Sequence, residues 1–106
     1  MRIQAAVRED RQRLDSWILY ARFAKTRTLA AKLVTSGFVR VNGQRIDNAA
    51  KALAIGDVVT VALGRATLVV RVEGLGQRRG PAPEARQLYI ELSQDNGALV
   101  SDTDSR

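Results

Sequence analysis

The sequence contains no cysteine and no histidine among its 106 residues. The absence of cysteine excludes disulfides and thiolate metal sites, and it is typical of proteins in a reducing compartment. The absence of histidine removes the usual general base near neutral pH and the commonest metal ligand. Catalysis is therefore disfavoured, and we expect a protein that is not an enzyme and that uses no cofactor or metal.

The chain also lacks a long apolar run. Residues 1–10 do not contain the apolar segment of a signal peptide, and no stretch approaches the ~20 apolar residues of a membrane span. We therefore expect a cytoplasmic protein without a membrane partner. A hydrophobic content of 45% over this length predicts one domain with a modest core. We expect a monomer, although unpaired sheet edges leave the oligomeric state open.

Positive charge is concentrated in the first part of the chain. Residues 1–45 hold ten Lys and Arg against three acids, residues 46–76 hold three of each, and residues 77–106 hold four bases and five acids. Fourteen of the 17 bases are arginine, whose planar guanidinium suits phosphate recognition. The clustering predicts a face that binds a nucleic-acid backbone. The alternative is a basic surface that only aids solubility.

Two helices are predicted within the basic region. Four apolar positions within residues 10–24 share the spacing of one helix face: Leu14, Trp17, Ile18 and Ala21. Trp17 is therefore expected in the core, and Asp15 is expected to cap this helix or to pair with a neighbouring arginine. The second helix is predicted over residues 27–36, capped by Thr26 and ended by Gly37. Its inward positions are Leu29, Ala30, Leu33 and Val34.

The residues that follow predict an antiparallel sheet. Residues 38–41 have the alternating pattern of a strand, and Asn42-Gly43 is a strong signal for a hairpin turn. Residues 44–46 are expected to form the second strand of this hairpin. After a poorly patterned link over residues 47–55, Gly56-Asp57 leads into strands at residues 58–63 and 66–72, joined by Gly64-Arg65. Residues 77–83 are expected to form a loop. Residues 85–92 fit a helix or a strand, and Pro83-Glu84 before them favours the helix.

An ordered set of motifs runs through residues 11–63: Arg13-Leu14-Asp15, Thr26-Arg27, Val41-Asn42-Gly43 and Gly56-Asp57. This set resembles the S4 RNA-binding domain family. The resemblance implies an α+β S4 (αL) fold, with two N-terminal helices packed on a small, mostly antiparallel sheet, a short C-terminal helix and a flexible acidic tail. We accordingly divide the chain into an N-terminal arm (1–10), an S4 RNA-binding domain (11–76), a basic loop with a short C-terminal element (77–92) and the tail (93–106).

A narrower resemblance extends beyond this module. Residues 13–17, 21–27, 41–45 and 77–85, with Leu88-Tyr89, are similar to the bacterial ribosome-associated heat-shock protein 15 family. This similarity implies a non-catalytic protein that binds ribosomal RNA or tRNA on the large ribosomal subunit and rescues stalled nascent-chain complexes. The chain departs from the family's long basic C-terminal helix, because residues 93–106 are acidic. Contacts made by such a helix are therefore not carried over to this chain.

The candidate RNA-binding residues lie on the two predicted helices and the hairpin. They are Arg13, Lys25, Thr26, Arg27, Lys32, Arg40, Asn42, Gln44 and Arg45, with a second group of Arg11, Arg22, Arg78 and Arg79. Donors of this kind contact the phosphates and 2′-hydroxyls of structured RNA with weak sequence preference. The alternatives are that Asn42 is only a turn former and that Arg78 and Arg79 belong to a solvated loop.

Two other functions remain open. One is the accessory S4 module of an RNA-modifying enzyme, although the sequence supplies no catalytic domain and the adjacent Glu9 and Asp10 have the pattern of a solvated turn. The other is a DNA-binding protein, since phosphate contacts alone do not separate DNA from RNA.

Overall fold

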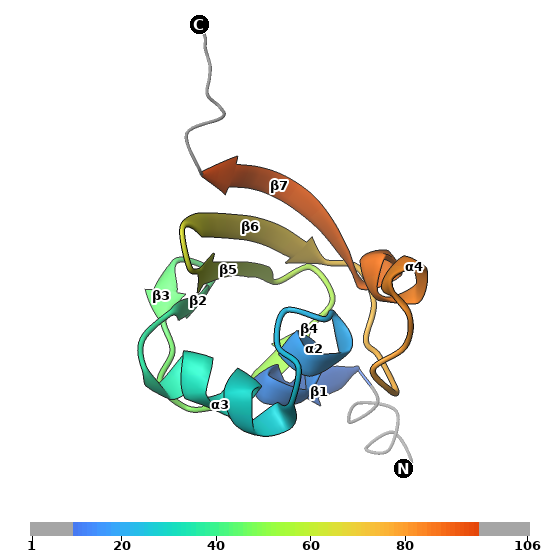
Figure 1. The fold of residues 1–106 in the computed structure, drawn as a ribbon, viewed down its shortest axis with the longest axis horizontal. Helices are drawn as coiled ribbons and strands as arrows, with labels where there is room; N and C mark the ends of the chain where they lie inside the picture. Colours follow the sequence, from blue (N-terminus) through green and yellow to red (C-terminus); the bar gives the residue numbers. More distant parts are fainter. Residues whose placement is uncertain (1–9, 96–106) are drawn as a thin grey trace, which may run out of the picture.

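The computed structural model describes residues 10–95 of the protein. The elements in chain order are β1 (Arg11–Arg13), α2 (Leu14–Tyr20), α3 (Arg27–Thr35), β2 (Val39–Val41), β3 (Gln44–Arg45), β4 (Ala52–Ala54), β5 (Val58–Leu63), β6 (Ala66–Val72), α4 (Ala82–Ala85), the 3-10 helix η1 (Arg86–Leu88) and β7 (Tyr89–Asp95). Five strands form an antiparallel sheet in the order β3-β2-β5-β6-β7, and β1 pairs with β4 in a separate ribbon. Helices α2 and α3 lie below the sheet, and α4 lies beside the start of β7 (Figure 1). None of the described helices is both long and apolar enough to cross a membrane.

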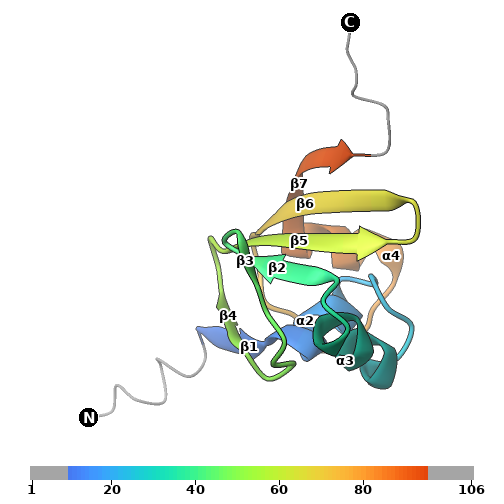
Figure 2. The same cartoon turned by 90° about the vertical axis from the view of Figure 1, so that its left-hand side faces the viewer.

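The first helix is shorter than its apolar spacing predicted. Residues 11–13 form a strand that pairs with β4, a segment of the link for which no element was expected. The backbone N–H groups of Leu14 and Asp15 then donate to the carbonyls of Lys51 and Ala49, at 2.9 and 3.0 Å. The ribbon lies apart from the main sheet in Figure 2. The helix indicated over residues 10–24 was therefore wrong at residues 10–13, where pairing with a distant segment decides the structure. It was also wrong at residues 21–24, because α2 ends at Tyr20 and Arg22 has a left-handed conformation.

The second helix and the hairpin agree with their local signals. Thr26 caps α3, its Oγ1 accepting a hydrogen bond from the Leu29 amide at 3.1 Å. Gly37 follows the helix with φ +89°, a left-handed conformation that suits glycine. Asn42 and Gly43 both have positive φ, at 52° and 84°, as a two-residue type I′ hairpin turn requires.

The sheet has one strand more than the sequence predicted. A short C-terminal helix is present as α4, but it ends at Ala85, and the helix preferred for residues 85–92 was wrong at residues 89–92, where β7 pairs with β6 from Val72–Tyr89 to Thr67–Asp95. The alternation of Leu88, Ile90 and Leu92 was thus a strand signal. The strand extends three residues into the segment predicted as an acidic tail. The rest of that tail and residues 1–9 of the predicted arm lie outside the described residues.

The core lies between the sheet and the two larger helices. Its fully buried side chains come from α2, α3, β4 and the three central strands: Leu14, Trp17, Ile18, Ala30, Val34, Val39, Leu53, Val59, Val61, Val70 and Val72. Trp17 is in the core, as predicted, and its Nε1 donates to the Gly74 carbonyl at 3.0 Å. Its ring makes edge contacts with Phe23 and Tyr89, at centroid distances of 6.0 and 6.4 Å. The indole thereby joins the residues after β6 to α2.

Candidate nucleic-acid interface

The start of α2 and the start of α3 are joined by an ion-pair cluster centred on Asp15. This side chain is buried, and its carboxylate accepts from Arg13 Nε and Nη2, both at 3.1 Å, and from Arg27 Nε at 3.4 Å. Burial alone would raise the pKa of Asp15. The hydrogen bonds from Arg13, the charges of Arg13 and Arg27 and the Ser16 amide outweigh burial and leave that pKa below its ordinary value. The expected pairing of Asp15 with a neighbouring arginine is confirmed.

The beginning of α3 presents the next group of predicted residues. Lys25, Thr26 and Arg27 are exposed around the first turn, and Lys32 is exposed further along the helix. Backbone N–H groups at a helix start carry a partial positive charge, which adds to these cations. The Thr26 hydroxyl is used by the cap, so its oxygen has a structural role first. The first turn of α3 is therefore an electropositive surface.

The β2–β3 hairpin supplies a further group of cations. Arg40 and Arg45 face each other directly across the two strands, and both are exposed, as is Gln44. The Arg45 guanidinium covers Gly37 so closely that a Cβ on Gly37 would lie 2.5 Å from Nη2. Like charges opposite each other are destabilising, whereas the carbonyls at the end of α3 favour a cation. Helix α3, about 14 Å long by its nine residues, thus connects the hairpin cations to those at its start.

Asn42 has a structural task in the hairpin. Its Nδ2 donates to Asp57 Oδ1 at 3.2 Å, and its Oδ1 accepts from the Val58 amide at 2.9 Å. These bonds fasten the hairpin turn to the turn before β5. The interpretation of Asn42 as a turn former therefore has a basis in both its φ angle and its partners.

The structure places the residues of the second predicted group in three different settings. Arg11 is exposed on β1, in the ribbon, and Arg78 forms an ion pair with Glu84, with Nη2 to Oε1 at 2.8 Å. Arg22 and Arg79 instead connect two loops. Arg22 Nη1 donates to the Gly80 carbonyl at 2.8 Å, and Arg79 Nε donates to the Ala24 carbonyl at 3.4 Å.

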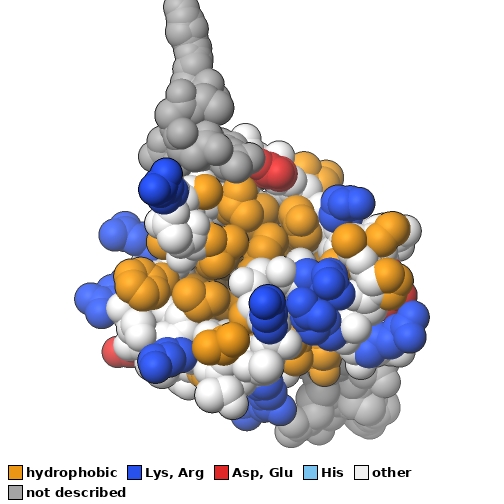
Figure 3. Space-filling view, viewed as in Figure 1, with side chains coloured by type: hydrophobic (Ala, Val, Ile, Leu, Met, Phe, Trp, Pro, Cys, Tyr) orange, Lys and Arg blue, Asp and Glu red, His pale blue; other side chains and the backbone are white. Residues whose placement is uncertain are grey.

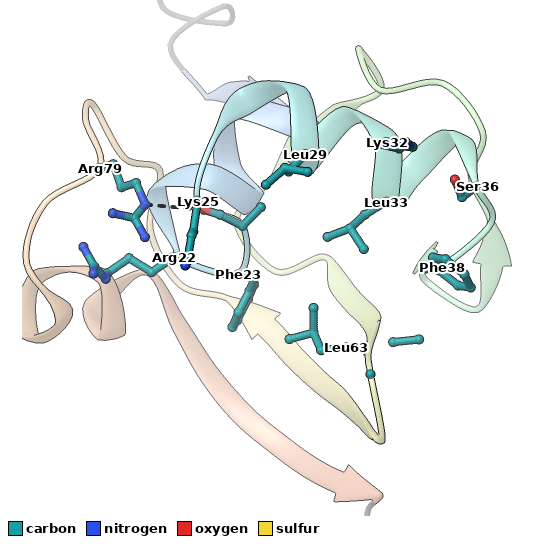
Figure 4. Close-up of a pocket in the computed structure, with 13 residues that line it drawn as sticks. Arg22, Phe23, Lys25, Leu29, Lys32, Leu33, Ser36, Phe38, Leu63 and Arg79 are labelled. Atoms are coloured by element: carbon teal, nitrogen blue, oxygen red, sulfur yellow. Dashed lines mark hydrogen bonds between the residues drawn. The ribbon is translucent and has the colours of Figure 1, made fainter.

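A groove of ≈ 980 Å³ opens between α3, the α2–α3 connection and the β5–β6 hairpin (Figure 4). Its apolar residues include Phe23, Leu29, Leu33, Phe38 and Leu63, and its cations are Arg22, Lys25, Lys32 and Arg79. In Figure 3 the apolar hollow lies among separate basic groups. Leu29 was predicted to face inward, but it is 47% exposed at this groove.

The groove was not predicted from the sequence, although one signal for it exists. Val39 and Val41 are buried in β2, so strand alternation turns Phe38 and Arg40 to the other side. An aromatic residue that alternates with the buried positions marks an apolar feature outside the core. Phe38 is indeed 51% exposed.

The S4 domain family model matches residues 12–59. Heat shock protein 15 of Escherichia coli strain K12 is 38% identical over 82 residues, an alignment that covers 77% of this chain and 61% of the relative. A heat shock protein 15 homolog of Aeromonas salmonicida is 42% identical over 94 residues, covering 89% and 70%. A structure described as trimeric heat shock protein 15 of Vibrio cholerae superposes with a TM-score of 0.74 at 41% identity, covering 78% of this chain and 83% of that one.

The fold is therefore that of an S4 domain protein. Within this class, the chain belongs to the heat shock protein 15 family, and it spans 61% of the length of the Escherichia coli relative. Both resemblances read from the sequence are thereby confirmed, together with the α+β S4 fold. The residue-by-residue RNA contacts, the domain boundaries and the monomeric state stay predictions.

Proposed function

We propose that the protein is a non-catalytic RNA-binding protein that grips structured RNA with the starts of α2 and α3 and the β2–β3 hairpin. The observation that carries this proposal is the presence of exposed cations at both ends of α3. Arg27 is at one end, beside Arg13 and the buried Asp15, and the opposed pair Arg40 and Arg45 is at the other. A polyphosphate would offset the repulsion between such cations.

The RNA that we propose is ribosomal, with tRNA as a further contact. Membership of the heat shock protein 15 family supports a role on the large ribosomal subunit, in the rescue of stalled nascent-chain complexes, and in the cytoplasm. Sucrose-gradient sedimentation of a lysate that contains the tagged protein tests this finer assignment. Comigration with free large subunits is expected, and a protein found only at the top of the gradient would contradict it.

Filter binding to several structured RNAs tests the broader assignment. Arg27→Ala is expected to weaken all of them together and to lower the slope of log affinity against log salt by about one, because one phosphate contact is lost. Arg86→Ala, which removes an exposed arginine on η1, is the matched control and should leave affinity unchanged. If Arg27→Ala and the unsubstituted protein bind RNA with equal affinity, the start of α3 is not part of the RNA-binding surface.

Competition with duplex DNA at equal salt separates RNA from DNA binding. Structured RNA should displace bound RNA at a lower concentration than duplex DNA does, because 2′-hydroxyl and shape contacts are added to the phosphate contacts. Equal displacement would favour the DNA-binding alternative. The same preparation, sedimented alone, distinguishes the expected monomer from a trimer like that described for the Vibrio cholerae protein.

A further inference from the structure

The groove beside α3 combines two surfaces that are usually separate. Its floor exposes large apolar side chains, with Leu29 at 47% and Phe38 at 51% exposure. Its rim carries four cations, and among the described residues no aspartate or glutamate lines it. A surface of this kind suits a ligand that has an apolar, planar part and a negative charge.

Arg22 and Arg79 are anchored at one end of this groove in a way that preserves their charge. Each donates one hydrogen bond to a backbone carbonyl of the other's loop, to Gly80 and Ala24 respectively. A guanidinium has five N–H donors, so most of the donors are left for a ligand. Within residues 10–92, neither arginine has a carboxylate in an ion pair. Figure 4 shows both side chains at the same end of the groove.

The backbone of Arg22 ends α2 and sets the direction of its side chain. Its φ is +68°, and the N–H groups of Arg22 and Phe23 donate to the Leu19 and Ile18 carbonyls, both at 3.0 Å, which is the Schellman ending of a helix. From this turn the Arg22 side chain reaches the Gly80 carbonyl.

We propose that this groove binds an unpaired stretch of RNA, with a phosphate at Arg22 and Arg79 at one end and a base against Phe38 at the other end, with Leu29 between them (Figure 4). Proteins that bind single strands combine a cationic groove with aromatic and apolar side chains in this manner. The inference rests on the proposed function in that the ligand is RNA. It adds a site for single-stranded RNA beside the surface for structured RNA, and Lys25 and Lys32 lie at the border of the two.

Two other occupants would satisfy part of the same chemistry. One is the segment after β7, in which Leu99 and Val100 are followed by Asp102 and Asp104. Strand β7 ends at Asp95, opposite Thr67 and near the Gly64 turn that lines the groove. The other is a second copy of the chain. An unpaired RNA stretch is favoured because a planar base matches the exposed aromatic side chain at one end and a phosphate matches the two guanidinium groups at the other.

Fluorescence anisotropy with the full chain tests the proposal on two labelled RNAs, a short oligouridine and a fully paired hairpin. Phe38→Ala and Arg79→Gln should each weaken oligouridine binding by about fivefold or more, and should weaken binding of the RNA hairpin much less. Ile90→Ala and Arg86→Gln are the matched controls, because both residues are exposed outside the groove. Phe38→Tyr keeps the ring and should keep oligouridine affinity.

Several results would overturn this site. If the protein binds the RNA hairpin but not oligouridine, the groove site is contradicted and the proposed function is not. If it binds neither RNA, the proposed function itself is contradicted. Equal losses for Phe38→Ala and Ile90→Ala would also count against the groove. A double variant, Asp102→Asn with Asp104→Asn, that raises oligouridine affinity while Phe38→Ala leaves it unchanged would also contradict the proposal. That result would assign the groove to the chain's own segment after β7. If the protein self-associates and Phe38→Ala abolishes this self-association, the groove would be assigned to a second copy of the chain.

Discussion

The protein anchors its arginines in two different ways. Arg13 and Arg27 share the buried carboxylate of Asp15, whereas Arg22 and Arg79 donate to backbone carbonyls on opposite loops. A carboxylate neutralises part of the charge that it positions, and a carbonyl does not. The first arrangement therefore stabilises the junction of α2 and α3 at some loss of net charge, while the second leaves its full charge for a ligand.

The two arrangements also differ in their place in the chain. The Asp15 cluster lies wholly within residues 12–59, which the S4 family model matches. Arg79 lies beyond that match, in the loop after β6. This loop is joined to β1 by the Gln12 amide, which exchanges two hydrogen bonds with Gly76, at 2.7 and 3.1 Å. The groove therefore depends on packing between the S4 module and the residues that follow it.

The largest effect is expected from Asp15→Asn. Because the carboxylate is buried and accepts from two arginines and a backbone amide, its loss should lower the free energy of unfolding by about 1–3 kcal/mol. Urea unfolding measures this change. Glu73→Gln is the control, since Glu73 also pairs with an arginine but at an exposed site where an ion pair contributes little. Equal changes in the two variants would mean that Asp15 is no more than a surface ion pair.

A smaller effect should separate the two kinds of arginine. Arg13→Gln is expected to reduce stability more than Arg79→Gln does, because only Arg13 loses a bidentate ion pair. Arg79→Gln should instead cause the larger loss of affinity for single-stranded RNA, because its charge is not neutralised. Thermal unfolding ranks the two variants by stability, and fluorescence anisotropy ranks them by affinity for single-stranded RNA. The reverse order in either measurement would contradict the distinction between carboxylate and carbonyl anchors.

The smallest effect is the pH dependence of the Asp15 contribution. Since the pKa of Asp15 is lowered in the folded protein, the unfolded chain binds more protons at acid pH, and stability rises with pH in that range. The contribution is fully present above the unfolded pKa of about 4 and is lost as the pH falls through the lower folded value. The stability gap between the parent protein and Asp15→Asn should therefore narrow below about pH 4. A gap that stays constant down to acid unfolding would show that the pKa is not lowered.

Elements with local signals could be predicted from the sequence, and those that depend on distant partners could not. Thr26, Gly37 and the Asn42-Gly43 turn set their own backbone geometry within a few residues, and the structure has them as expected. Strand β1 exists only because β4 lies beside it, some forty residues away in the register Arg11–Ala54. Strand β7 likewise depends on β6. Alternation alone does not decide such cases against a helix.

The candidate site shows the same division. The clustering of cations predicted which residues carry the charge, and the structure places Arg27 at the start of α3 and Arg45 beside Gly37 at its end. The acceptors that hold Arg22 and Arg79 were not visible in the sequence, because Arg22 and its acceptor Gly80 are 58 residues apart. Leu29 was assigned inward because its spacing fits the helix face, yet it lies at the edge of that face, where the groove begins.

The salt dependence of structured-RNA binding tests the central claim most directly. If the cations along α3 and the hairpin neutralise four to six phosphates, log affinity should fall against log salt with a slope of roughly −3 to −5. The measurement uses the full chain and one structured ribosomal RNA fragment over a range of monovalent salt. A slope near zero would contradict the account, because the surface would then not be binding through its charges.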